Sequence, residues 1–168
     1  QNVLIYDDAG DHAGLQAAEV IAKAGGKVEI MPRDRAFAPE VMAMNLVPYM
    51  RELQKRDAVF TVTYLLKAFR RQGNQLVAVI GSDYGGIHKE QTHDQIIVNQ
   101  GTRPNADLYF ALLPFSKNNG AVDYERLIAG QPQPDGEGEF QLYRIGDAVA
   151  ARNTHAAVYD ALRLVKDI

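Results

Sequence analysis

The stretch Val3-Leu-Ile-Tyr6, followed by the segment from Ala13 to Ala24, decides the fold class. The first four residues are apolar and short enough for a buried strand, and the second segment carries apolar residues at helical spacing. Val28-Glu-Ile30 gives a second strand, and a second helix follows from Pro39, bent or restarted at Pro48. Short apolar strands that alternate with amphipathic helices need cover on both faces, so this order predicts a parallel sheet in an α/β fold.

The pattern changes after a third predicted strand, Ala58-Val-Phe-Thr-Val-Thr63. Residues 64–70 and 75–80 flank a Gly73-Asn74 turn, which joins antiparallel neighbours. Residues 94–99 form a further strand in this prediction. The sequence therefore predicts an antiparallel meander after the parallel strands.

A polar loop is predicted between the last two strands of the meander, over residues 81–93. It contains His88-x-Glu90-x-x-His93, which has the composition of a metal site. Its spacing is not that of a helical metal motif, so we expect solvent-facing side chains there and no metal ligand.

The segment Phe140-Gln-Leu-Tyr-Arg-Ile-Gly146-Asp147-Ala148 predicts a strand, a tight glycine turn, an acidic residue and a helix. A helix N-terminus presents unpaired N–H groups and a positive partial charge, so this turn could bind a phosphate. The Asp147 carboxylate could accept hydrogen bonds from sugar-like hydroxyls. Arg152 and Asn153 follow near the expected helix start, within reach of phosphate or solvent. The alternative is that Asp147 only caps the helix.

The last predicted helix has an apolar stripe on one face, which we expect to pack against the sheet. His155 belongs to this stripe, which favours a core or interface histidine over a ligand or an acid–base group. The stripe consists of Ala148, Ala151, His155, Val158, Leu162 and Val165.

Composition excludes several classes of function. Of the 168 residues, 46% are hydrophobic and 23% charged, which is normal for a globular protein, and the net charge of −3 gives no support for nucleic acid as a partner. No apolar run approaches the roughly 20 residues that span a bilayer, so we expect no membrane partner and a cytoplasmic location. The absence of cysteine excludes a thiol nucleophile or a cysteine-bound cluster within these residues.

A domain crossing is predicted at Gly101-Thr-Arg-Pro-Asn105, where a glycine ends a strand and a proline keeps the chain extended. We therefore expect domains at residues 1–105 and 106–168. A strand that begins at Val3, directly after a start without methionine, also suggests that the chain is cut from a longer protein. The order of parts resembles the two-dinucleotide flavoproteins, in which a Rossmann-like nicotinamide domain is inserted into a flavin domain.

Three further segments narrow this resemblance: residues 6–13, residues 116–123 and the run from Ile145 to Leu162. They are similar to the C-terminal region of the NADH:flavin oxidoreductases of the old yellow enzyme class. That class includes 2,4-dienoyl-CoA reductase, trimethylamine dehydrogenase and demethylases of N-methylated amino acids. The resemblance covers essentially the whole chain and implies a three-layer nicotinamide-type domain in residues 1–105, followed by the remainder of a flavin- or ADP-binding domain.

The resemblance also implies a function that is completed by sequence outside this chain. An FMN barrel with a four-iron cluster would carry catalysis, either oxidation or demethylation of a small amine or reduction of an enoyl substrate. No residue here is predicted to be catalytic, so the chain alone should be inactive. FAD or ADP would bind at a split site, to which this chain contributes Gly146, Asp147, Ala148 and Arg152. The intact protein would be a homo-oligomer.

One departure from the family pattern concerns nicotinamide. A dinucleotide loop needs glycines so that the backbone can approach the pyrophosphate, but only Gly10 and Gly14 fit here, in different registers. Asp8 and Asp11 bring carboxylates to the position of the phosphates, which predicts little affinity for NAD(P)H. If it does bind, Arg33 and Arg35 are the candidates for holding a 2′-phosphate. A nicotinamide-type domain with little affinity for NAD(P)H resembles that of the family members that pass electrons to an electron-transferring flavoprotein.

Two alternatives come from other classes of protein. Asp7-Asp8 after the first strand is also found in receiver domains, but these need an aspartate at the end of the third strand, and residues 58–63 contain none. The other alternative is a non-catalytic module that shapes an oligomer or docks an electron-transfer partner, with vestigial nucleotide sites.

Overall fold

The computed structural model describes residues 1–82, 84–134 and 136–165. The chain divides into two compact units between Gly101 and Thr102, which we call the N-terminal and the C-terminal unit. Within the described residues, no helix has the length and apolar character needed to cross a membrane.

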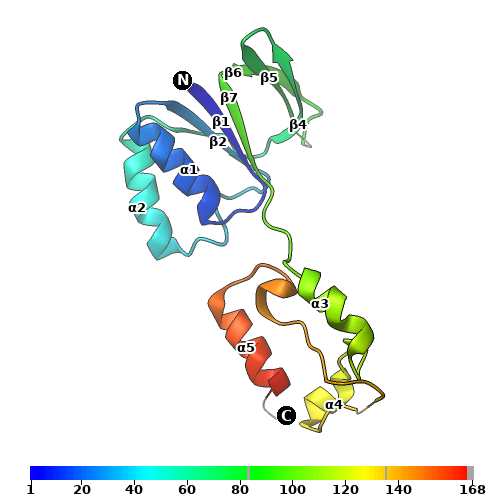
Figure 1. Ribbon diagram of the computed structural model, residues 1–168. Coiled ribbons are helices and arrows are strands. Elements are labelled where there is room, and N and C mark those ends of the chain that lie inside the picture. Colours follow the sequence, from blue (N-terminus) through cyan, green and yellow to red (C-terminus); the bar gives the residue numbers. More distant parts are fainter. Residues whose placement is uncertain (83, 135, 166–168) are drawn as a thin grey trace. The chain divides into compact units, whose positions relative to one another are not determined.

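A parallel sheet forms the centre of the N-terminal unit (Figure 1), with the strand order β3-β2-β1-β7. Its strands are β1 (Asn2–Asp7), β2 (Lys27–Pro32), β3 (Val59–Phe60) and β7 (Gln95–Asn99). Helices α1 (His12–Lys23) and α2 (Ala43–Gln54) cover one face. Val3, Ile5 and Ile30 point to that side, where they bury Leu15 of α1 and Leu53 of α2.

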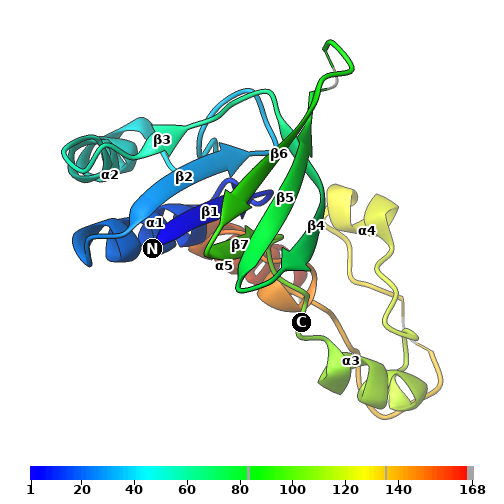
Figure 2. The ribbon, with the colours of Figure 1, turned by 90° about the horizontal axis from the view of Figure 1, so that it is seen from above.

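An antiparallel sheet covers the other face (Figure 2). It consists of β4 (Leu65–Gln72), β5 (Gln75–Gly81) and β6 (His88–His93), in that order. Because side chains alternate along a strand, Leu4 and Tyr6 of β1 face this second sheet, where they pack with Ala78 and Ile80 of β5. The unit therefore has three layers, which confirms the predicted α/β fold with a parallel sheet and an antiparallel meander.

The two-residue turn at Gly73-Asn74 is confirmed, but the strand assignment after it was partly wrong. Residues 88–93 are not a loop: they form β6, the third strand of the meander. Residues 95–99 leave the meander and pair in parallel with β1. The predicted third strand is also shorter, since only Val59–Phe60 pairs with β2. The meander that follows it excludes the receiver-domain alternative, which requires further helix crossovers.

Helices dominate the C-terminal unit. They are α3 (Asp107–Leu112), α4 (Tyr124–Ala129) and α5 (Thr154–Val165), with 3-10 turns η1 (Leu113–Phe115) and η2 (Gly146–Ala148). The predicted strand over residues 140–145 is not formed. Only Phe140 makes a bridge, in parallel with Ser116, because the described part of this unit supplies no further strand.

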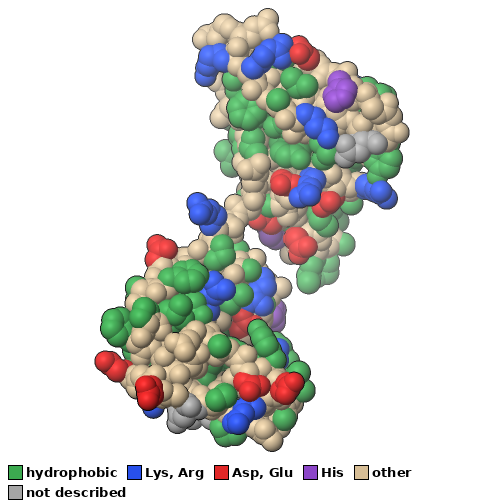
Figure 3. Space-filling model, turned by 90° about the vertical axis from the view of Figure 1, so that its right-hand side faces the viewer, with side chains coloured by type: hydrophobic (Ala, Val, Ile, Leu, Met, Phe, Trp, Pro, Cys, Tyr) green, Lys and Arg blue, Asp and Glu red, His purple; other side chains and the backbone are tan. Residues whose placement is uncertain are grey.

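The predicted packing of the α5 stripe was also wrong for this chain. Val158, Leu162 and Val165 are 63%, 58% and 51% exposed, and His155 is exposed too. Both clusters of buried hydrophobic residues belong to the N-terminal unit, and Figure 3 shows hydrophobic side chains at the surface of the C-terminal unit. The stripe stays exposed because the sheet expected to cover it is not formed within the described residues.

Candidate functional site

The turn at Gly146 is tight and packs closely on α5. Gly146 is buried and has a φ of 55°, in the left-handed region that favours glycine. A Cβ atom at this position would lie 3.1 Å from the Cβ of Ala157. The N–H of Val149 donates to the Gly146 carbonyl at 2.9 Å, which closes the 3-10 turn. The positive φ and the close approach of Ala157 therefore both favour glycine at this position.

The turn does not open the long helix, which corrects the sequence prediction. Helix α5 begins at Thr154, and Asn153 caps it by accepting the N–H of Ala156 at 2.9 Å. Asn153 is thus the cap of α5. Asp147 is exposed, and no hydrogen bond or ion pair to its carboxylate is recorded within the described ranges. It is therefore not the helix cap, and its carboxylate faces solvent.

Arg152 is held by Asp160, a residue that the sequence analysis did not single out. Its guanidinium pairs with the Asp160 carboxylate, and the Gly146 N–H donates to the same carboxylate at 3.1 Å. The hydrogen bond from Arg152 lowers the pKa of Asp160 below its usual range; desolvation opposes this shift, and the Gly146 N–H adds to it more weakly. Local spacing gives no signal for the contact, because Asp160 lies on α5 far along the chain from Gly146.

A small pocket of about 200 Å³ lies beside this cluster. Arg144, Arg152 and Arg163 line it together with Asp160. Arg144 also lies over the Tyr109 ring at 5.2 Å from the centroid. Three guanidinium groups against one lining carboxylate give the pocket a positive balance, which suits an anionic group.

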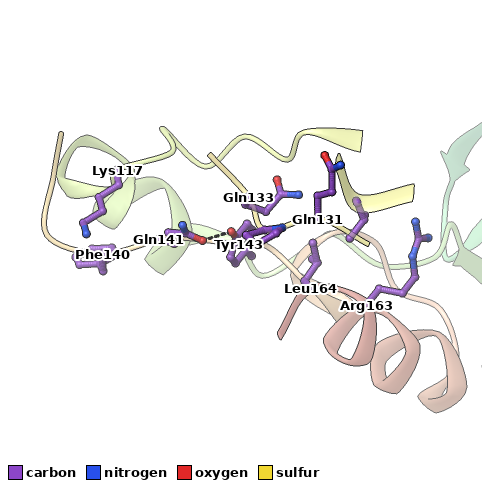
Figure 4. Close-up of a pocket in the computed structure, with 10 residues that line it drawn as sticks. Lys117, Gln131, Gln133, Phe140, Gln141, Tyr143, Arg163 and Leu164 are labelled. Atoms are coloured by element: carbon purple, nitrogen blue, oxygen red, sulfur yellow. Dashed lines mark hydrogen bonds between the residues drawn. The ribbon is translucent and has the colours of Figure 1, made fainter. Parts of the chain in front are cut away.

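A larger pocket of about 510 Å³ lies in the same unit and is shown in Figure 4. Lys117, Arg163 and three glutamines, Gln131, Gln133 and Gln141, line it, and the Tyr143 hydroxyl donates to Gln141. None of the residues predicted for the half-site lines this pocket.

The β1–α1 loop of the N-terminal unit is filled by its own carboxylates. Asp7 is buried, and its Oδ1 accepts the Gly10 N–H at 3.1 Å and the Asn99 Nδ2 at 2.8 Å. Burial raises the pKa of Asp7, while these two hydrogen bonds oppose the rise. A Cβ atom at Gly14 would lie 2.6 Å from Asp7 Oδ2. Gly14 therefore makes room for an internal carboxylate.

The other two acidic residues of the loop also have partners. Asp11 caps α1 by accepting the Ala13 N–H at 2.9 Å, and it accepts Asn99 Nδ2 at 3.1 Å. Asp8 pairs with Arg33 at 3.3 Å. The donor at the start of α1 that a phosphate would use is thus taken by Asp11.

A pocket of about 290 Å³ lies beyond β2, lined by Arg33, Asp34, Arg35, Thr63, Leu65 and Tyr84. The Arg35 guanidinium lies 5.3 Å from the centroid of the Tyr84 ring. Both arginines singled out for a 2′-phosphate therefore line one pocket.

The histidines and the glutamate of residues 88–93 do not converge. Glu90 pairs with Arg70 at 2.8 Å, and His93 is buried with its Nδ1 atom unpartnered. No set of three or more histidine or acidic side chains in the described part of the chain is arranged to hold a metal ion.

The three-layer unit, followed by a glycine turn packed on a helix, has the architecture of the Rossmann-like domains of flavoproteins. Histamine dehydrogenase from Rhizobium sp. 4-9 aligns with a TM-score of 0.71 and 19% identity, over 100% of this chain and 23% of that protein. Thioredoxin reductase from T. acidophilum aligns with a TM-score of 0.60 and 16% identity, over 99% and 51%. At such identities these likenesses establish the fold alone.

Proteins with a similar sequence indicate more closely which class of flavoprotein the chain resembles. A probable N-methylproline demethylase of Rhizobium meliloti is 67% identical over 170 residues, and an N,N-dimethylglycine/sarcosine dehydrogenase of Chromohalobacter salexigens is 41% identical over 174 residues. Each match covers 99% of this chain and 25% of the relative, so the chain spans about a quarter of their length. No protein-family model matches the chain. The chain is therefore similar to the C-terminal region of the old yellow enzyme class of NADH:flavin oxidoreductases, and it matches about a quarter of the length of each of these relatives.

Proposed function

We propose that this chain is the nucleotide-binding region of a flavin-dependent enzyme that oxidises and demethylates a small N-methylated amine or amino acid. The observation that carries this proposal is the 67% identity to the probable N-methylproline demethylase along nearly the whole chain. Catalysis would take place on an FMN barrel with a four-iron cluster, formed by sequence outside this chain. The residues described here would bind nucleotide and have no catalytic role.

FAD or ADP is the ligand that we propose for the C-terminal unit, at a site shared with sequence outside this chain. Gly146, Asp147, Ala148 and Arg152 form the half-site. Two features support it: the exposed Asp147 carboxylate, which can accept from ribose or ribityl hydroxyls, and the arginine-lined pocket beside the turn, which suits phosphate. The start of α5 is not included in this half-site, because Asn153 caps it.

The test of the half-site is Asp147→Ala in the full-length protein. We expect weaker retention of FAD or ADP at the second site and unchanged FMN, measured by flavin release and by calorimetry with ADP. Glu125→Ala is the matched control, since Glu125 is an exposed carboxylate of the same unit. Second-site nucleotide held by Asp147→Ala as tightly as by the wild type would refute the half-site.

For the N-terminal unit we propose little or no affinity for NAD(P)H. The donor that a pyrophosphate needs at the start of α1 is occupied by Asp11, and the Asp7 and Asp8 carboxylates would repel it. Calorimetry with NADH and NADPH on this chain should give affinities weaker than micromolar. A low-micromolar affinity would contradict the proposal, and loss of NADPH binding in Arg33→Ala or Arg35→Ala would then assign the pocket beyond β2 to the 2′-phosphate.

Without a nicotinamide donor, electrons would leave the protein, and an electron-transferring flavoprotein is the acceptor that fits this proposal. A second candidate is alkene reduction, favoured by 33% identity to a multifunctional alkene reductase/demethylase of Caballeronia cordobensis. Turnover of N-methylated amines against enoyl substrates by the full-length protein separates the two. No turnover with either would favour a non-catalytic module. A homo-oligomer is expected for the intact protein and can be tested by light scattering.

A further inference from the structure

We infer that Asp160 is a positioning residue of the C-terminal unit, which holds the Gly146–Ala148 turn in its binding shape through a clamp with Arg152. The inference rests on the proposed nucleotide site, but the clamp itself can be tested separately. Arg152, which is proposed above as part of the half-site, would then act on the ligand through Asp160.

The Asp160 carboxylate joins three separate points of the chain. Asp160 lies on the second turn of α5, Gly146 lies in the turn and Arg152 lies in the connection between them. Asp160 Oδ2 accepts the Gly146 N–H and contacts the Arg152 guanidinium, while Oδ1 lies 3.5 Å from Arg152 Nη1. Residues 149–153 form no helix or strand, and this carboxylate joins Arg152 within that segment to Gly146 before it.

Several backbone N–H groups around the turn are already occupied by internal hydrogen bonds. Three of the N–H groups around the turn are used internally: Gly146 donates to Asp160, Ala148 to the Ile145 carbonyl and Val149 to the Gly146 carbonyl. Asp147 lies between them with an exposed carboxylate. Because these bonds hold the backbone on both sides of Asp147, no backbone ordering is needed at this residue when a ligand binds.

The role of Asp160 in positioning the turn can be distinguished from its effect on the charge of the small pocket. Asp160 also neutralises part of the charge of Arg144, Arg152 and Arg163 around the small pocket. If neutralisation were its only role, removing the carboxylate would leave the pocket more positive and tighten the binding of an anionic nucleotide. If Asp160 positions the turn, its removal weakens binding despite the added positive charge. The two roles therefore predict opposite signs.

The experiment compares Asp160→Ala, Asp160→Asn and Arg152→Ala in the full-length protein, with ADP and FAD as the probes. We expect ADP to bind about tenfold more weakly to Asp160→Ala, as for the loss of a hydrogen bond to a charged group. Asp160→Asn keeps an acceptor for the Gly146 N–H and should recover part of the loss. The double variant of both alanines should be no worse than Asp160→Ala alone, because the two residues act as one unit.

Amide hydrogen exchange of the nucleotide-free protein supplies a readout that does not depend on the ligand. The Gly146 amide should exchange faster in Asp160→Ala and Arg152→Ala, and Arg152→Lys should restore part of the protection. Glu90→Gln, which breaks an exposed ion pair with Arg70 in the other unit, is the matched control and should change neither readout.

Two results would overturn the inference: tighter ADP binding by Asp160→Asn, or unchanged binding and unchanged Gly146 exchange in Asp160→Ala. Asp147→Ala distinguishes a failure of the underlying proposal. If that variant binds ADP normally, the nucleotide site is wrong, and the exchange of Gly146 still decides whether the clamp exists.

Discussion

Gly14 shows how a single missing side chain shapes the β1–α1 loop. Asp7 places its carboxylate against this glycine, in a space that a Cβ atom would enter to 2.6 Å. The glycine is retained as in a dinucleotide loop, but it accommodates an internal anion. Gly10, Gly14 and the acidic residues are close in the sequence, so their pattern alone predicts a loop unsuited to pyrophosphate, and this stays a prediction until NAD(P)H binding is measured.

We expect Gly14→Ala to destabilise the chain by about 1 kcal/mol. Overpacking costs roughly 1–3 kcal/mol, and the gain in helix propensity offsets about 1 kcal/mol of that. Urea denaturation measures the change, and Gln16→Ala on the exposed face of the same helix is the control. In an Asp7→Ala background, where the space is open, Gly14→Ala should become neutral or stabilising. The same loss in both backgrounds would contradict the steric explanation.

Contacts between residues far apart in the chain could not be predicted from the sequence. Asn99 binds Asp7 and Asp11 from the neighbouring strand β7, and Asp160 binds Gly146 from the last helix. Both look like ordinary polar residues, because the hydrogen bonds that distinguish them form only after folding.

At the level of elements, apolar strands were predictable and polar ones were not. β1, β2 and β5 contain the hydrophobic residues that fill the core. β6 has the sequence His-Lys-Glu-Gln-Thr-His and no apolar alternation, so it is a strand only because β5 offers a free edge. Residues 140–145 have the pattern of a strand but do not form one, because the described part of their unit offers no partner strand.

Strand β6 carries a pH-dependent contribution to stability. His93 is buried on the side that faces Glu29 and Asp94, and desolvation lowers its pKa despite these two carboxylates. The unfolded chain therefore binds a proton more readily, so the free energy of unfolding should fall as the pH drops below the usual histidine value of about 6.5. Above that value the contribution is constant.

His93→Gln should flatten this dependence relative to the wild type. Urea denaturation at a series of pH values between about 5 and 8 measures it. His88→Gln, at an exposed position of the same strand, should keep the wild-type slope. An unchanged slope in His93→Gln would assign the pH dependence to another group.

At the scale of the whole molecule, stability is concentrated in the N-terminal unit. Both buried hydrophobic clusters lie within it, whereas large apolar side chains of the C-terminal unit are exposed, including Leu108 at 72% and Ile128 at 80%. Since burial of apolar surface is the main favourable contribution to folding, the N-terminal unit should be stable by itself.

We therefore expect residues 1–101 to unfold cooperatively, at the same urea midpoint as the main transition of the whole chain. Leu4→Ala, which empties part of the cluster between the two sheets, should cost about 2–5 kcal/mol in both forms. Val20→Ala is the control, because Val20 is 68% exposed. A non-cooperative transition of residues 1–101 would show that the C-terminal unit contributes to this core.

Asn99 has a consequence for the evolution of the loop. Its amide donates to Asp7 and Asp11, its Oδ1 accepts the Gly101 N–H, and its carbonyl accepts the Asp8 N–H. A mutation of Asp11 to glycine would reopen the helix start, but it would also remove the α1 cap and one partner of Asn99. A substitution that makes the loop more suitable for phosphate thus also removes a hydrogen-bond partner of a neighbouring residue. If the loop binds no pyrophosphate, as proposed, a single substitution would not be enough to create such a site, because each change also removes an internal hydrogen bond.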